Sequence, residues 1–143
     1  MEPARGRAQS SIFGSPAERN EVPWDIAVEL EDRPGTLAQL GAATGEAGIN
    51  ISGVCGSASE NGGVIHILVD DAEVAVPILV NAGLEIQDKR EVLVVEVEDR
   101  PGVLGETAKR FGDAGINIDL VYLAAGTRLV LGVDDIEAAR SLT

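Results

Sequence analysis

The sequence contains one block of residues twice. The pentapeptide EDRPG occupies residues 31–35 and 98–102, and AGINI occupies residues 47–51 and 114–118. Both motifs recur at the same offset of 67 residues, so the repeat includes the spacing between them. A solenoid with such a period needs at least about three copies to bury a continuous face. Because only two copies fit, we expect two small domains in tandem.

Each copy is predicted to open as strand, tight turn, helix and strand. Apolar and polar residues alternate before the first EDRPG motif, which is typical of a half-buried strand, and its proline suits a first helical turn. Gly48 and Gly115 stand where a left-handed helix cap is favoured. Residues at helical spacing are expected to line one helix face: Leu37, Leu40, Thr44 and Ala47 in the first copy, and Leu104, Thr107, Phe111 and Ala114 in the second.

The remaining pattern predicts the order strand, helix, strand, strand, helix, strand for the first copy. Its strands are expected at 24–30, 49–54, 64–69 and 84–87, its helices at 36–47 and 73–82, and connectors at 56–63 and 88–91. For the second copy we expect strands at 92–97, 116–123 and 128–133, a helix at 103–114, and about two helical turns in 136–143.

This βαββαβ order is the ferredoxin-like plan of the α+β class, in which two helices cover one face of an antiparallel sheet. The second copy is predicted to lack its last strand, which would leave its first strand at a sheet edge. A partner chain, the segment around Ser11 to Phe13, or simple truncation would account for that edge. The expected domains are a flexible tail at 1–23, a first domain at 24–90 and a second, shorter one at 91–143.

Composition excludes several classes of function. The net charge of −13 argues against nucleic acid and anionic membranes as partners, and an aromatic content of 3% offers no platform for stacking bases. No apolar run approaches the roughly 18 residues of a membrane span. A single cysteine, Cys55, excludes a disulfide framework within the chain and a cysteine-rich zinc site. We expect a cytoplasmic protein.

With the turn, the helix and the AGINI strand start in place, the chain resembles the ACT-domain family of small-molecule-binding regulatory modules over residues 24–143. The resemblance implies an amino acid bound where two ACT units meet, between the turn of one unit and the second-strand start of its neighbour. The residues implied are Asp32, Arg33, Gly35, Thr36, Leu37, Asn50 and Ile51, with Asp99, Arg100, Gly102, Val103, Leu104, Asn117 and Ile118 in the second copy.

The chemistry of the turn suits an amino acid. Unpaired N–H groups at a helix start favour a carboxylate, a turn aspartate accepts from an ammonium, and asparagine both donates and accepts. Leu37, Ile51 and their counterparts would surround the side chain. An alternative stays open for each polar residue, because aspartate in a turn and asparagine at a strand start often bind nearby backbone N–H groups instead. The identity of the ligand also stays open.

Other chemically distinctive residues have simpler interpretations. Arg33 and Arg100 are expected to pair with Glu31 and Glu98, and the aspartate pairs at 70–71 and 134–135 are expected to cap helices rather than bind a metal. His66 is expected on a sheet face, and Cys55 is expected to be a small buried residue. No metal, cofactor or catalytic motif is predicted.

Three hypotheses follow. The first is a non-enzymatic regulatory protein, expected as a homodimer, that binds an amino acid between ACT units paired within one chain or across a dimer. The second is a regulatory subunit that acts on a partner enzyme of amino-acid metabolism by protein contact. The third is an enzyme that cradles phosphate on the turn arginine, as acylphosphatases do, and it rests on fold analogy alone.

Overall fold

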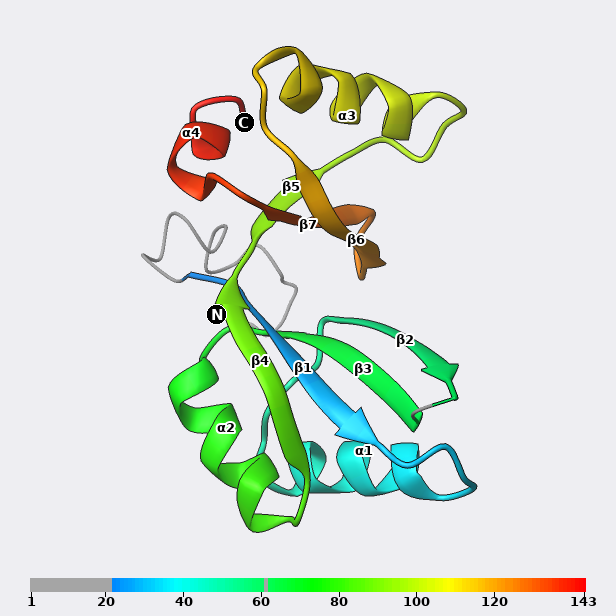
Figure 1. The fold of residues 1–143 in the computed structure, drawn as a ribbon. Helices are drawn as coiled ribbons and strands as arrows, with labels where there is room; N and C mark the ends of the chain where they lie inside the picture. The colour runs from blue at the N-terminus through cyan, green and yellow to red at the C-terminus, as the bar shows by residue number, and fades with distance from the viewer. Residues whose placement is uncertain (1–21, 61) are drawn as a thin grey trace.

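The computed structural model describes residues 22–60 and 62–143. The predicted tail at 1–23 therefore lies almost wholly outside the described residues, and so does the segment around Ser11 to Phe13. The described chain forms two units that follow each other in sequence (Figure 1).

The first unit has the complete βαββαβ order. Its four strands form an antiparallel sheet in the order β4-β1-β3-β2, and both helices lie on one face of it (Figure 1). The elements are β1 (Trp24–Leu30), α1 (Thr36–Glu46), β2 (Gly53–Ser59), β3 (Gly62–Val69), α2 (Ala72–Asn81) and β4 (Glu85–Glu91). The period-two pattern therefore located β1 correctly.

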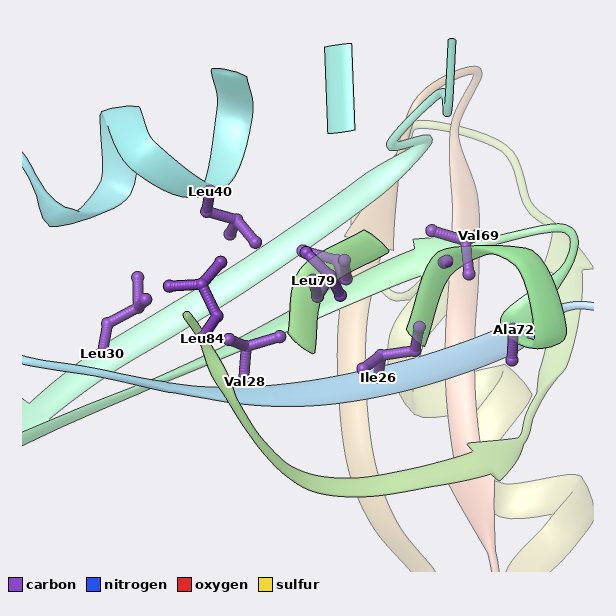
Figure 2. Packing of buried hydrophobic residues seen from close by; sticks show 10 residues of the cluster. Ile26, Val28, Leu30, Leu40, Val69, Ala72, Leu79 and Leu84 are labelled. Carbon is purple, nitrogen blue, oxygen red and sulfur yellow. The ribbon is translucent and has the colours of Figure 1, made fainter. Parts of the chain in front are cut away.

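The core of the first unit lies between this sheet and its helices. Ile26, Val28 and Leu30 alternate along β1 and point to the same side, where Leu40 of α1 and Leu79 of α2 meet them (Figure 2). All five side chains are buried. The apolar residues that repeat every second position in the strand thus meet those that repeat at helical spacing.

The second unit repeats this plan through five elements. They are β5 (Leu93–Glu96), α3 (Val103–Asp113), β6 (Ile118–Ala124), β7 (Arg128–Val133) and α4 (Ile136–Arg140). The strand order is β6-β7-β5, so β5 lies at the edge of the sheet. No strand follows α4 between residue 141 and the last described residue, Thr143. Phe111 of α3 is fully buried in the core of this unit.

The two units share one seven-stranded sheet in which β2 pairs with β6. This junction is short: Gly53 and Ala124 form its one residue pair, supported by a 2.9 Å hydrogen bond from the Ala125 N–H to the Ser52 carbonyl. A second apolar cluster comprises Leu68, Val92, Tyr122 and Val130. These residues come from both units, so the helix-free faces pack against each other while the helices lie on the outside (Figure 1).

Two strands differ from the sequence-based prediction. The second strand was expected at 49–54 but β2 runs from Gly53 to Ser59, so the predicted connector at 56–63 is largely strand. The polar run at 88–91, also predicted as a connector, belongs to β4. Pairing with β3 and β1 supplies the backbone partners in both cases, and such non-local pairing overrides weak local β-propensity.

One burial prediction was wrong, and the predicted helix faces are buried only in part. Leu40 and Thr44 of α1 and Thr107 and Phe111 of α3 are buried. Leu37 and Leu104 are 57% and 54% exposed, and Ala47 and Ala114 are exposed too. Cys55 was expected to be buried but is exposed. It lies opposite His66 of β3, on the sheet face that no helix of the described chain covers.

Candidate functional site

The first corner connects β1 to α1. Gly35 has φ of 95° and precedes α1, and no side chain caps the helix. This left-handed conformation is strained for residues with a Cβ atom. Thr36 Oγ1 donates to the carbonyls of Glu31 at 2.8 Å and Arg33 at 3.2 Å, which holds the turn in shape. The first N–H groups of α1 have no side-chain cap.

The second corner has the same backbone but a different charge arrangement. Gly102 has φ of 90° and again no side chain caps the helix. Arg100 contacts Glu98 at 2.8 Å and binds Glu106 with two hydrogen bonds of 2.7 and 2.8 Å. The bonds to Glu106 and Glu98 raise the pKa of Arg100, and the bond to Arg100 lowers the pKa of Glu106. Arg100 is thus held by two carboxylates.

The corresponding residue to Glu106 in the first copy is Gln39, whose side chain donates to the carbonyl of Ala82 at 3.1 Å. Among the described residues, the Arg33 guanidinium therefore pairs with Glu31 alone, at 3.0 Å. Both predicted Arg–Glu pairs are present, and the pairing at Arg100 leaves that guanidinium poorly suited to cradle a phosphate. The two corners share one backbone and differ in how firmly the arginine is held.

Each corner borders a hollow. The first hollow has a volume of about 460 Å³ and a polar wall formed by Glu29, Leu30, Glu31, Asp32, Arg33, Thr36, Gln39, Gly62, Gly83, Leu84 and Glu85. The second has a volume of about 530 Å³ and is largely apolar, with a wall formed by Val97, Glu98, Asp99, Val103, Leu104, Val121, Tyr122, Leu123, Ala124, Thr127 and Leu129. Each hollow is built from one unit.

The structure brings together only part of the predicted site. Asp32, Arg33 and Thr36 meet at the first hollow, and Asp99, Val103 and Leu104 at the second. Gly35, Leu37, Arg100 and Gly102 lie in the same turns or at the helix starts. The strand-start residues border neither hollow. Ile51 and Ile118 pack against the two cores, with Asn50 and Asn117 exposed beside them.

The turn aspartates and the strand-start asparagines were given two possible roles. Within residues 22–60 and 62–143, the side chains of Asp32, Asp99, Asn50 and Asn117 make no hydrogen bond or ion pair. The alternative in which they bind nearby backbone N–H groups is therefore not what the described residues adopt. Their donors and acceptors face the solvent.

Asp71 and Asp135 cap helices, as predicted, whereas Asp134 binds a backbone N–H before β6. Asp71 accepts from the N–H groups of Glu73 and Val74 at the start of α2, and Asp135 accepts from that of Ala138 at the start of α4. Asp134 accepts from the N–H of Asn117 at 3.1 Å. No cluster of three or more His, Cys, Asp or Glu residues suited to a metal occurs in the described chain.

One polar group escaped the sequence analysis. Asp25 in β1 is 1% exposed, and it binds His66, which lies on the sheet face as expected, and Tyr122 of the second unit. Alternation placed Asp25 on the face away from the helices, where an aspartate is ordinarily solvated. No local signal showed that the second unit would cover it.

Comparison with known proteins gives a family match within the second unit. A family model described as ACT domain matches residues 92–138. The matched residues run from the start of the second unit into α4. No curated protein matches the chain by sequence.

Solved structures with the same fold span both units. Protein BT0572 from Bacteroides thetaiotaomicron aligns with a TM-score of 0.75 at 18% identity, covering 86% of this chain and 88% of that one. The ligand-free regulatory subunit of aspartate kinase from Thermus thermophilus aligns with a TM-score of 0.64 at 19% identity, covering 85% and 87%. At such identity the likeness shows the fold, including the ACT arrangement of strands and helices.

In the described part of the chain, no helix has the length and apolar character needed to cross a bilayer.

Proposed function

We propose that this chain is a non-catalytic regulatory protein that binds a free amino acid at the corners of its ACT units. The observation that carries the proposal is the repeated pairing of an uncapped helix start, after Gly35 or Gly102, with a turn aspartate. Asp32 and Asp99 have no partner in the described residues. Each corner thus places N–H donors that suit an anion beside a carboxylate that accepts hydrogen bonds.

The second corner offers all three contacts that an amino acid needs. The N–H groups that follow Val103 at the start of α3 have no side-chain acceptor and suit a carboxylate. Asp99 suits an ammonium, and the apolar wall of the second hollow suits a side chain. That wall includes Leu104, Val121 and Leu123, which are all more than 45% exposed. Burying such side chains against a ligand is favourable at roughly 25 cal/mol per Å² of apolar area.

A second copy of the chain supplies the neighbouring unit in this proposal. Leu37 and Val54 of the first unit correspond to Leu104 and Val121 of the second, and all four are large apolar side chains exposed to solvent. An exposed apolar surface repeated at matching positions is typical of an interaction site. Because each hollow is formed by a single unit of this chain, the proposed ligand interface lies between chains.

The binding test is a thermal-shift screen of the standard L-amino acids, followed by calorimetric titration of any that bind. A ligand that binds the folded state raises its apparent melting temperature. Asp99→Asn should weaken binding by at least several-fold, whereas Asp113→Asn, at the far end of α3, should leave it unchanged. If no amino acid shifts the melting temperature of the wild-type chain, the proposal is wrong.

The dimer is tested separately by sedimentation. Leu123→Glu places a charge in the exposed apolar surface and should give monomers at concentrations where the wild type is dimeric. Glu137→Gln, an exposed change in α4, should not alter the sedimentation coefficient. A wild-type chain that remains monomeric at high concentration contradicts the homodimer.

A second function is favoured by the comparisons. The chain aligns along 87% of a protein described as the regulatory subunit of aspartate kinase, which suggests a regulatory subunit that acts through contact with an enzyme of amino-acid metabolism. Co-purification of such an enzyme with the tagged chain would support this function. Recovery of the chain alone, with full ligand response, would favour the first proposal.

A further inference from the structure

The buried carboxylate of Asp25 connects the two units. Its Oδ1 accepts a 2.7 Å hydrogen bond from the Tyr122 hydroxyl, and its Oδ2 lies 2.8 Å from His66 Nδ1. Asp25 and His66 belong to β1 and β3 of the first unit, whereas Tyr122 belongs to β6 of the second. We refer to these three residues as the Asp25 network.

A buried carboxylate of this kind fixes one arrangement of the two units more readily than it increases the free energy of unfolding. Removing an ionised group from water is costly, and its hydrogen bonds offset that cost only when its donors are well placed. The surrounding cluster of Leu68, Val92 and Val130 favours burial without selecting a direction. The Tyr122–Asp25 hydrogen bond instead selects a single orientation of β6 over β1, and His66 holds the other oxygen of the carboxylate within the first unit.

The junction between the units leaves this orientation for the network to determine. Only Gly53 and Ala124 pair between β2 and β6, and a single pair in a ladder restrains the angle between two strands weakly. An exposed ion pair between Arg90 and Asp119 adds a further contact between the units, and exposed pairs usually contribute little.

Tyr122 also belongs to the wall of the second hollow, together with Leu104 and Leu123. A side chain that contacts a bound molecule on one side and Asp25 on the other is shared by the candidate site and the unit interface. Any shift of β6 on binding therefore acts directly on the Tyr122–Asp25 hydrogen bond.

We propose that the Asp25 network sets the angle between the two ACT units and transmits occupancy of the second hollow to the first unit. Asp25 is a positioning residue that contacts no ligand, and Tyr122 is the residue through which both sites communicate. The transmission step rests on the proposed amino-acid binding, whereas the setting of the angle does not.

The angle is tested without any added molecule. Asp25→Asn should increase hydrogen exchange at β6 and around Val92 while leaving the amides of α1 and α3 as protected as in the wild type. His66→Gln removes the second partner of Asp25, at a side chain that is 28% exposed. It should increase the same exchange rates less strongly, and it replaces Asp25→Asn if that variant does not fold. Asp113→Asn serves as the charge-matched control.

Because Tyr122 is the sole tyrosine of the chain, its absorbance tests the contact with Asp25 independently. The phenolate absorbance of Tyr122 should develop at lower pH in Asp25→Asn than in the wild type, because the carboxylate no longer opposes ionisation. Equal phenolate titrations in the two proteins, or exchange that rises uniformly over all elements, would overturn the proposal.

Transmission is tested with each standard L-amino acid that shifts the wild-type melting temperature. Its addition should alter exchange at β1 and β3 in the wild type and in Asp113→Asn, but not in Asp25→Asn at saturation. An identical response in Asp25→Asn overturns transmission. If no amino acid binds the wild type, the proposed function fails, and the ligand-free exchange still decides whether the network sets the angle.

Discussion

At the scale of single residues, Gln39 and Glu106 decide how the two corners differ. They occupy equivalent positions in the repeat, yet Glu106 holds Arg100 with two hydrogen bonds and Gln39 turns away to the carbonyl of Ala82. A carboxylate in the first turn of a helix already satisfies its positive end. The start of α1 therefore lacks the carboxylate that lies in the first turn of α3.

Exchanging these two side chains should reverse that difference. Glu106→Gln removes a negative charge and leaves Arg100 paired with Glu98 alone, so a ligand carboxylate at the second corner should bind several-fold more tightly. Gln39→Glu should weaken binding at the first corner for the opposite reason. Calorimetric titration with the amino acid selected by the thermal-shift screen measures both, with Asp113→Asn as the control. Unchanged affinities would show that neither helix start holds the carboxylate.

The phenol of Tyr122 should make the free energy of unfolding fall at alkaline pH. Burial is the main cause that raises the pKa of Tyr122 in the folded chain, and the hydrogen bond to Asp25 is the second. An unfolded tyrosine ionises at about pH 10. Its stabilising contribution is therefore complete below that pH and is lost as the pH rises above it. Urea unfolding should show this decline in the wild type and a shallower one in Tyr122→Phe. Parallel curves for the two proteins would contradict the assignment.

At the scale of elements, glycine has different roles at two positions in and beside α1. Gly35 has φ of 95° before the helix, while Gly41 lies in its exposed middle with ordinary helical geometry. A Cβ atom would meet nothing within 4 Å at either position. Only the backbone conformation therefore distinguishes them.

Alanine should consequently act with opposite sign at these two glycines. Gly35→Ala should cost about 1–2 kcal/mol because of the left-handed backbone, and Gly41→Ala should gain about 0.5–1 kcal/mol because glycine is the poorer helix former. Chemical denaturation of both variants at neutral pH measures the two changes. Each variant controls for the other, and changes of the same sign would refute the explanation.

At the scale of the whole molecule, the two units are held together by their helix-free faces. Leu68 and Val130 are almost fully buried there, although no helix covers either of them. Arg90 of β4 reaches over β7, where it donates to the Val133 carbonyl at 3.1 Å. The close approach at this point depends on Gly132, since a Cβ atom there would lie 3.0 Å from the Arg90 guanidinium.

Adding that Cβ atom should disturb the contact between the units. Gly132→Ala should lower the free energy of unfolding by about 1–3 kcal/mol, as is usual for overpacking, because Leu120 Cβ would also lie only 2.8 Å away. Gly112→Ala, where nothing lies within 4 Å, is the matched control and should not destabilise the chain. Thermal and urea unfolding check both, and equal stability of Gly132→Ala and the wild type would contradict the expected crowding.

Local patterns predicted much of each unit. Alternation located β1, Asp71 was recognised as a helix cap, and Gly35 and Gly102 were placed at the turns before α1 and α3. These features depend on residues close together in the chain, so a short stretch of sequence is sufficient. The tertiary arrangement was needed to extend β2 to Ser59 and to expose Cys55 and Leu37.

The sequence by itself determined the repeated corner: its glycine, aspartate and arginine, the helix that follows, and the order of the elements. Only the tertiary structure decided what covers each sheet. It turned the helix-free faces toward each other, buried Asp25 beneath Tyr122, and left Asn50 and Asn117 outside both hollows. The physical reason is that backbone conformation follows from neighbouring residues, whereas burial follows from apolar surfaces that meet across a sequence separation of almost a hundred residues.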